Sequence, residues 1–530
     1  MQDKGEPVRR AHQPRYPAFR KISLSMMLFS LILYSCTAPV FSHTVPTPSS
    51  AEFQKPYSPT PPSPDLSPNP TPPSKKESPA PIPTQASPAE QNRTRYQLEA
   101  TLDYPQHTLS VSETITYTNH TAEAIGSLML VVEPARQAGV FHLSSIHGPQ
   151  GDSLEPLSFG NGQMTLPLRL ASGERMRFSI TYELLLPEAP GVLGFTSRQV
   201  NLGDWYPFIP PYQAGVGWQV HAPGTVGEFL VYEAGDYQVS IRLLKPPEHT
   251  VIAASAGAQM QGDAYHYHLA SARSFAWSAS DSYQVFKAEA RTASGDIQVI
   301  SYVFPEHVQA GERAAQVSAQ ALALYAEQFG LPAGTEYPHP SLAVVEADFF
   351  DGMEYDGLYF LGRDYYDGYD GTAQNYLVAL SAHETAHQWW YGILGSDQAI
   401  QPWLDEAFST YSELLFYERY YPELVAWWWE YRVNRFIPQG WVDSTIYDQS
   451  YFRPYVNAVY LRGALFLEHM RVVIGDEAFF GTLRAYVAAF AGRQASTRDF
   501  FETVKKHTAM DISSLVANYF KDPCTFSVCK

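Results

Sequence analysis

The segment His383-Glu384-Thr385-Ala386-His387 constrains this chain most, because it places two histidines four residues apart in an apolar stretch patterned as a helix, residues 374–394. Positions i and i+4 share one helix face, so both imidazoles can bind one zinc ion. Glu384 lies beside them, where its carboxylate can accept a proton from water that the metal activates. Two helix histidines that bind nothing are the alternative, and a third ligand would distinguish the two interpretations.

Glu406 is the candidate third ligand. It follows His387 by 19 residues, after a loop from Gly392 to Pro402, in a stretch that reads as a second helix from Leu404 to Tyr420. A helix, a short loop and a returning helix can bring Glu406 to the histidine pair. The sequence therefore predicts one Zn²⁺ per chain, held by three side chains with one open position.

Glu413 lies two turns after Glu406, on the same face of the second predicted helix. There it could accept the free N–H of a ligating histidine and orient the ring. A solvated surface acid is the alternative interpretation.

These residues resemble the gluzincin metallopeptidases of the aminopeptidase N (membrane alanyl aminopeptidase) family. Gly352-Met353-Glu354 resembles that family's Gly-x-Met-Glu-Asn exopeptidase motif, and Tyr460-Leu-Arg-Gly-Ala464 resembles its Tyr-x-Lys-Gly-Ala segment. The resemblance covers roughly residues 93–520 and is diffuse in the first half of that range. It implies a zinc aminopeptidase that removes the first residue from peptides with a free amino terminus.

The resemblance also implies roles for individual residues. Glu354, in the segment with Gly352 and Met353, would hold the α-ammonium group of the substrate. Tyr460 would donate its phenol O–H to the oxyanion that forms during hydrolysis, with Tyr455 as a rival for this role. Glu384 would accept the proton of the attacking water and pass it to the leaving amine.

The chain departs from the family pattern at three places. Tyr355 replaces the Asn that closes the exopeptidase motif, which puts recognition of the free amine in doubt. Asp405-Glu406-Ala407 replaces the usual Asn-Glu-Gly, and Arg462 replaces Lys. Two other functions therefore stay open: a zinc endopeptidase of the thermolysin-like type, and a cell-surface binding module with a vestigial site.

The amino terminus predicts export. Residues 1–21 carry six basic side chains and precede an apolar run from Ile22 to Ser35, which is shorter than the roughly 20 residues of a transmembrane helix. Leu33-Tyr34-Ser35-Cys36 resembles a bacterial lipobox, although Tyr34 is larger than the residue usual there. We expect residues 1–44 to be an export signal and Cys36 to carry lipid on the bacterial cell surface. Free secretion and an uncleaved anchor are the alternatives.

Residues 45–92 are rich in Pro and Ser and predict a disordered tether. The net charge of −18 excludes nucleic acid as a partner, because nucleic-acid binding requires a basic face. Cys524 and Cys529, in a tail from 523 to 530, are candidates for a disulfide bond in an exported chain.

The remaining sequence predicts an α+β multidomain fold. Short alternating runs such as Thr108–Tyr117 and Tyr237–Leu244 indicate an antiparallel β-sandwich or saddle at 93–288. The resemblance implies a thermolysin-like, mainly helical domain at 289–522, and the pattern there indicates strands at Ile297–Phe304 and Ser341–Val345 and a helix at Ala310–Phe329. Fewer residues follow Tyr460 than the helical repeat domain of larger family members would need, so a short form is expected.

Overall fold

The computed structural model describes residues 93–330, 339–526 and 528, which lie in one compact unit, Ile82–Lys530. The predicted export signal (1–44) with Cys36, the predicted tether (45–92) and Cys529 lie outside the described residues. Cys524 is disulfide-bonded, and its pairing with Cys529 stays a prediction. No helix in the described ranges is both long enough and apolar enough to cross a membrane.

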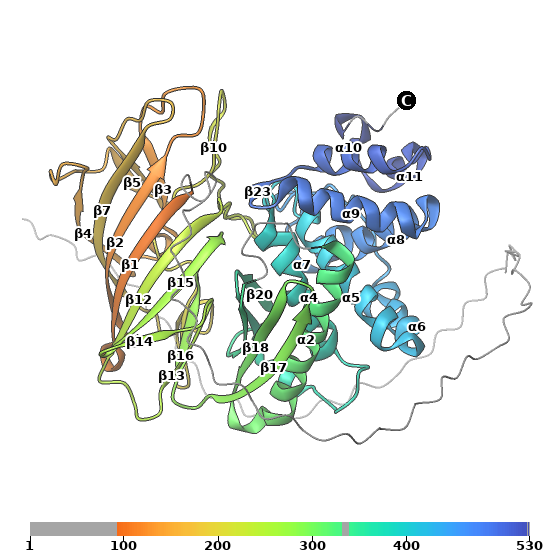
Figure 1. Ribbon diagram of the computed structural model, residues 1–530, viewed down its shortest axis with the longest axis horizontal. Helices are drawn as coiled ribbons and strands as arrows, with labels where there is room; N and C mark the ends of the chain where they lie inside the picture. Colours follow the sequence, from red (N-terminus) through yellow and green to blue (C-terminus); the bar gives the residue numbers. More distant parts are fainter. Residues whose placement is uncertain (1–92, 331–338, 527, 529–530) are drawn as a thin grey trace, which may run out of the picture. The chain divides into compact units, whose positions relative to one another are not determined.

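A seven-stranded sheet forms the frame of the amino-terminal half, in the order β14-β15-β12-β1-β2-β7-β4 (Figure 1). Its strands are β1 (Thr94–Asp103), β2 (Thr108–Thr118), β4 (Phe141–His147), β7 (Arg175–Leu185), β12 (Gly235–Leu244), β14 (Gln259–Gln261) and β15 (Ala264–Ala272). Both strands quoted from the sequence pattern are present, as β2 and β12. The pairing of β1 with β12 is parallel, whereas the other pairs in the sheet are antiparallel.

Three smaller sheets pack with this frame around one hydrophobic core. Their strands are β3 (Leu128–Val131), β5 (Ser158–Gly160), β6 (Gln163–Leu166), β8 (Leu193–Phe195), β9 (Val200–Leu202), β10 (Tyr212–Gln213), β11 (Gly217–Trp218), β13 (Val251–Ala254) and β16 (Trp277–Ser280). Alternation explains the packing, because every second side chain of a strand faces the same side of its sheet. In β2 the buried positions include Leu109, Val111 and Ile115.

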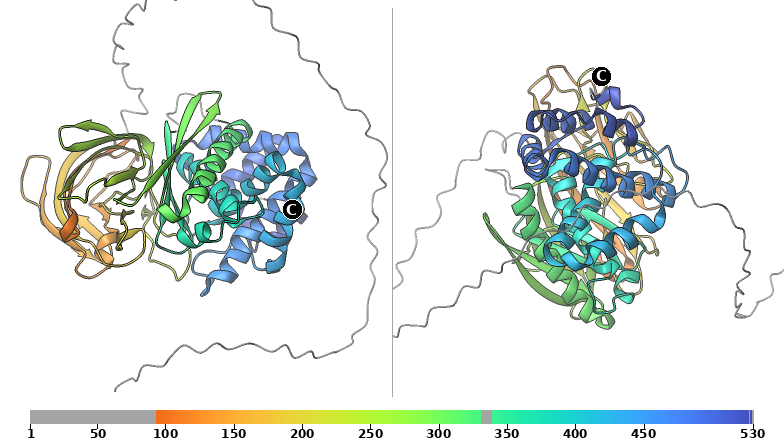
Figure 2. Two further views of the ribbon diagram at one scale, coloured as in Figure 1. Left: turned by 90° about the horizontal axis from the view of Figure 1, so that it is seen from below. Right: turned by 90° about the vertical axis from the view of Figure 1, so that its right-hand side faces the viewer.

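A five-stranded mixed sheet, ordered β17-β18-β19-β21-β20, lies between the strand-rich half and the helices (Figures 1 and 2). Its strands are β17 (Gln284–Thr292), β18 (Gly295–Val303), β19 (Ser341–Ala347), β20 (Gly352–Tyr355) and β21 (Leu358–Gly362). β17 pairs with β18 along its length. The sheet therefore takes in the last residues of the range predicted for the β-domain.

Helices make up most of the rest of the chain. The longer ones are α2 (Val308–Phe329), α4 (Tyr376–His387), α5 (Trp403–Tyr420), α8 (Arg462–Ile474), α9 (Asp476–Phe490), α10 (Thr497–His507) and α11 (Ser513–Tyr519). Short helices are α3 (Arg363–Asp367), α6 (Val425–Trp428) and α7 (Phe452–Val456). α2 matches the helix expected from Ala310, and it packs on β17 and β18.

The helix that carries the histidine pair differs from expectation at its end. Asn375 caps α4 by accepting a hydrogen bond from the backbone N–H of Leu377, and nearly every residue of the helix is buried. The α-helix ends at His387 and continues as π-helix over Gln388–Ile393, so the predicted span of 374–394 is not one regular helix. π-Helical turns of this kind often occur at functional sites.

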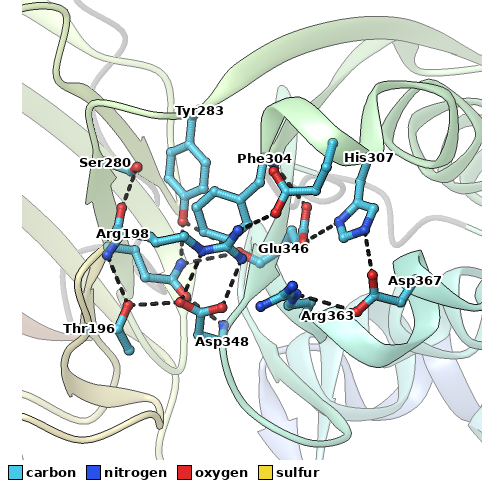
Figure 3. Close-up of polar contacts among 12 residues, drawn as sticks. Thr196, Arg198, Ser280, Tyr283, Phe304, His307, Glu346, Asp348, Arg363 and Asp367 are labelled. Carbon is cyan, nitrogen blue, oxygen red and sulfur yellow. Dashed lines mark hydrogen bonds and ion pairs between the residues drawn. The ribbon is translucent and has the colours of Figure 1, made fainter.

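Arg198 joins the strand-rich half to the five-stranded sheet (Figure 3). Its guanidinium binds Asp348 at 2.9 Å, pairs with Glu306 and lies over the ring of Phe304. Beside it, His307 bridges two carboxylates, with Nδ1 2.7 Å from Glu346 and Nε2 2.9 Å from Asp367. Because Asp348 follows β19 and precedes β20 in the chain, this network holds the segment that leads into β20.

Arg273 forms a second link between the strand-rich half and the helical half of the chain. It is 2% exposed, and its guanidinium donates to the backbone carbonyls of Tyr391, Tyr232 and Arg493. A Cβ atom at Gly395 would overlap that guanidinium, so glycine is required there. Buried arginine is tolerated because each of its three guanidinium nitrogens donates to a backbone carbonyl.

Glu113 lies on the buried face of β2, where an ionisable side chain affects the stability of the fold. It is 0% exposed, neither carboxylate oxygen has a hydrogen-bond partner, and burial raises its pKa well above the ordinary value. A carboxyl with a raised folded pKa binds its proton more tightly in the folded state. Stability is therefore lost as pH rises above the unfolded pKa of about 4.3.

We expect Glu113→Met to raise the free energy of unfolding by about 1–3 kcal/mol at pH 5 and by more at pH 8. Urea unfolding at both pH values measures this change. Glu99→Met, at an exposed position of β1, is the control and should change stability by less than about 0.5 kcal/mol. Equal effects of Glu113→Met at the two pH values would contradict a raised pKa.

Candidate functional site

Two facing helices, α4 and α5, bring the three predicted metal ligands together. Glu406 Oε2 lies 3.3 Å from His383 Nε2 and 3.8 Å from His387 Nε2. One ligand atom from each residue lies within 4.8 Å of the others, and all three residues are buried. The histidines come from the last turn of α4 and Glu406 from the first turn of α5, as the helix, loop and helix pattern predicts.

The donor set fits zinc. Tetrahedral coordination with bonds of about 2.0–2.1 Å places ligand atoms about 3.3 Å apart, close to the separations of Glu406 from the two histidines. Glu406 Oε2 is also buried without a hydrogen-bond partner, which is costly unless a cation lies against it. His383, His387 and Glu406 could therefore hold one zinc ion.

Glu413 orients His383, in the position predicted for it. Its Oε1 lies 3.0 Å from His383 Nδ1, which leaves Nε2 of that ring free to face the metal site. Arg432 donates to both oxygens of Glu413 and Trp428 Nε1 donates to Oε2, so the carboxylate is fixed and stays ionised. Burial opposes this ionised form, but Arg432 and His383 outweigh it and lower the pKa of Glu413.

Asp405 orients the imidazole of His387 in the same way, a role that the sequence analysis missed. Its Oδ1 lies 2.5 Å from His387 Nδ1, and its Oδ2 accepts a hydrogen bond from Gln398 at 2.7 Å. Ser409 Oγ lies 3.2 Å from the same imidazole nitrogen. The sequence offers one signal for this role: Asp405 replaces the family's Asn directly before the predicted ligand Glu406.

Glu384 projects from α4 toward β20. Burial raises its pKa to about 7, although His387 and His383 oppose the rise, and its Oε2 has no hydrogen-bond partner. A carboxylate with a pKa near neutrality can both accept and release a proton. A Cβ atom at Gly352 would overlap the Glu384 carboxylate, so the backbone of β20 approaches the predicted base as closely as glycine allows.

The structure distinguishes Tyr460 from its rival Tyr455. Tyr460 lines the cavity of the metal ligands and stacks on His383, with ring centroids 6.1 Å apart and planes 1° apart. Tyr455 is 0% exposed, packs edge-on against Tyr460 and does not line that cavity; its hydroxyl lies against Gly227, behind the cavity wall. Arg462 donates to the carbonyl of Asn518 and so points toward α11.

Two further carboxylates, Glu354 and Glu228, line the cavity of the metal ligands. Glu354 is 3% exposed and accepts a hydrogen bond from Gln398 at 3.1 Å. Glu228, which the sequence analysis missed, lines the same cavity from a loop of the strand-rich half. Burial and the nearby carboxylates raise the pKa of both groups, that of Glu228 to about 8.

Tyr355 does not enter the cavity of the metal ligands. Its O–H donates to Asp204 at 3.1 Å, and Tyr232 donates to the other oxygen of Asp204 at 2.6 Å. The departure from the family's Asn therefore fastens β20 to the strand-rich half. It leaves Glu354, the preceding residue, buried beside the metal ligands.

The cavity has a volume of about 260 Å³. Glu384, Glu354, Tyr460 and the three metal ligands all line it, and Gly352 lies in its wall. A second cavity of about 430 Å³ shares Gly227 and Glu228 with it. Met353 and Tyr355 line the second cavity rather than the first.

Residues 313–519 match the peptidase family M1 domain. The chain carries a peptidase family M1 domain. The M1 zinc metallopeptidase of Deinococcus radiodurans has a similar fold, with a TM-score of 0.56 and 18% identity over 80% of this chain and 93% of that one. A variant of that M1 peptidase with the substrate Tyr-Ser-Ala bound gives a TM-score of 0.55 at 19% identity, with the same coverage.

Curated aminopeptidases are also similar to part of this chain. Aminopeptidase M1-D of Oryza sativa subsp. japonica is 26% identical over 226 residues, which is 40% of this chain and 25% of that protein. Leucyl aminopeptidase of Saccharolobus solfataricus is 23% identical over 240 residues, 42% of this chain and 30% of that protein. The match thus spans about a quarter of the first curated relatives. The predicted aminopeptidase N-type gluzincin family and the α+β fold class are confirmed.

Replacing Glu413 tests how the outer carboxylate supports the M1 metal site. Glu413→Gln leaves the buried Arg432 without its counter-charge and weakens the hold on His383. We expect zinc affinity to fall about 10- to 100-fold in competition with a chelator. Glu418→Gln is the matched control, because Glu418 lies on α5 like Glu413. It breaks a more exposed ion pair, with Arg471 of α8, and should leave zinc affinity unchanged.

Proposed function

We propose that the chain is a zinc-dependent aminopeptidase that hydrolyses the amino-terminal residue from peptides. The observation that carries this proposal is the excess of carboxylates in one cavity. Glu228, Glu354, Glu384 and Glu406 line it with no lysine, and of its two arginines Arg432 is bound to Glu413. A zinc ion neutralises part of this charge, and the α-ammonium of a substrate supplies a further cation beside Glu354 and Glu228.

Zinc, when bound, polarises the scissile carbonyl and acidifies water. Glu384 accepts the proton of the attacking water and delivers it to the leaving amine, which its pKa of about 7 suits. Tyr460 keeps its phenol protonated, because burial and Glu406 raise its pKa well above the ordinary value. Its O–H can therefore donate to the developing oxyanion.

Glu354 and Glu228 set the position of the substrate. A charge-assisted hydrogen bond from an ammonium to a buried carboxylate is strong, and here it fixes the first residue beside the metal ligands. The adjoining cavity, lined by Met353, Tyr355 and Phe229 among others, is the space into which the first side chain can extend. The Tyr-Ser-Ala complex of the Deinococcus radiodurans M1 peptidase is consistent with a peptide substrate.

We also propose that the protein acts outside the cytoplasm, held at the bacterial surface through lipid on Cys36. The lipobox-like Leu33-Tyr34-Ser35-Cys36 after an apolar run supports this proposal. Secretion without an anchor is the other outcome that export would give.

Peptides with free and acetylated amino termini test the aminopeptidase proposal. The protein should cleave leucyl-aminomethylcoumarin, and acetylation should abolish cleavage. Glu384→Gln should lower kcat by more than about 100-fold with zinc content unchanged. Cleavage of the acetylated peptide alone would reject the proposal in favour of an endopeptidase.

Glu354→Gln should lower kcat/KM by about 100-fold or more, since it removes a buried counter-charge for the ammonium. Glu327→Gln is the control. Glu327 is an exposed acid at the end of α2, outside the cavity, and pairs with Arg419, so this change should leave kcat/KM unchanged. An equal loss in both variants would argue against an amine anchor.

Cys36→Ser tests the anchor. In cells that process lipoproteins, the unsubstituted protein should fractionate with membranes, and the variant should lose its lipid label. Lipid labelling that persists in Cys36→Ser would contradict attachment at this cysteine.

A further inference from the structure

Arg453 adds a cation to the cavity of the metal ligands, in which Glu228 and Glu354 form an acidic wall. Glu228 and Glu354 lie on the acidic wall, and Glu228 is shared with the second cavity. Arg453, on α7, lines the first cavity together with Phe436 and Phe452, and none of these three residues lines the second. The cavity therefore presents both carboxylates and a guanidinium to a ligand.

Packing holds the Arg453 guanidinium in place, and its N–H groups remain available to a ligand. Its Cζ lies 4.3 Å from the ring centroid of Phe436, and Asn457 Nδ2 fixes that segment by donating to the Phe436 carbonyl at 3.0 Å. Within the described ranges, no hydrogen bond or ion pair uses the N–H groups of Arg453. A guanidinium stacked on an aromatic ring keeps its in-plane N–H groups available for a carboxylate.

The other cation of the cavity is not available in this way. Arg432 donates through Nε and Nη2 to Glu413, which in turn holds His383. A substrate carboxylate that took Arg432 would have to break this buried pair, at a large cost. Arg453 is thus the cation that a ligand can reach without disturbing the metal site.

Two exposed aromatic side chains also line the cavity. Phe350 is 74% exposed and Phe452 is 44% exposed, and both line the cavity. Large aromatic side chains are rarely left this exposed in clusters unless something binds there. They offer an apolar surface to the residues of a peptide bound in this cavity.

We propose that Arg453 binds a carboxylate on the part of the substrate that follows the scissile bond. The carboxylate is either the α-carboxylate of a short peptide or the side chain of an Asp or Glu just after the first residue. This inference rests on the proposed aminopeptidase function and names its substrate class: short or acidic peptides, held by the ammonium at one end and a carboxylate at the other. Arg453 is a specificity-determining residue in this assignment.

The test compares kcat/KM for matched peptides at low ionic strength. Leu-Gly-Gly against its carboxamide reports the α-carboxylate, and Leu-Asp-Gly-amide against Leu-Asn-Gly-amide reports a side-chain carboxylate. We expect one of these ratios to be on the order of tenfold, as for a partly exposed Arg–carboxylate pair, and to shrink with added salt. If both ratios are close to one in the unsubstituted protein, the proposal is overturned.

Variants assign the preference to Arg453. In Arg453→Ala the acid-to-amide ratio should fall to about one, and Arg453→Lys should keep part of it. Arg435→Ala is the matched control, because Arg435 also packs on Phe436 but does not line the cavity, so the full ratio should remain. A ratio that survives in Arg453→Ala, or in Arg453→Gln if the alanine variant fails to fold, would overturn the assignment.

Binding separates this inference from the proposed function. Calorimetry on zinc-loaded Glu384→Gln protein measures the affinity for Leu-Gly-Gly and its carboxamide without cleavage. Acid preference in binding supports the role of Arg453 even if leucyl-aminomethylcoumarin is not cleaved, a result that would reject the aminopeptidase proposal alone. Cleavage of leucyl-aminomethylcoumarin without any acid preference, in rates or in binding, overturns the inference and leaves the aminopeptidase proposal standing.

Discussion

The pairing of buried histidines with buried carboxylates across α4 and α5 is the interaction on which the site depends. An ionisable group removed from water is costly unless a partner compensates for the lost hydration. Here His383 meets Glu413 and His387 meets Asp405, while Glu406 faces the other nitrogen of both rings. These pairs fix the register of the two helices, and the ligand geometry follows from that register.

The strand-rich half contributes side chains to the cavity of the metal ligands as well as to the architecture. It contributes Glu228 to the lining of the cavity of the metal ligands, and through Asp204 it holds Tyr355, the residue after Glu354. Arg198 and Arg273 tie the same half to the segments that lead into β20 and away from α4. The acidic wall of the cavity therefore depends on contacts between parts of the chain more than 100 residues apart.

Much of the fold could be predicted from the sequence because its signals are local. The alternation in β2, the pattern of α2 and the spacing of His383, His387 and Glu406 each lie within a short window, and the structure has these elements where they were expected. Glu228 could not be found in this way, because no local pattern distinguishes an acid in a loop from one that folds into a cavity. In the sequence, Asp405 differs from the family pattern but carries no sign of its contact with His387, because that contact forms only when α5 packs on α4.

Gly352 shows how little space separates the two walls of the site. Its lack of a side chain lets the backbone of β20 lie against the carboxylate of Glu384, and the gap between them, here called the slot, is too narrow for a methyl group. In a library randomised at this position, every residue larger than glycine would push the base away from the metal ligands. Tolerance at position 352 thus measures the width of the slot: a library that recovers only glycine would show that its walls cannot move apart.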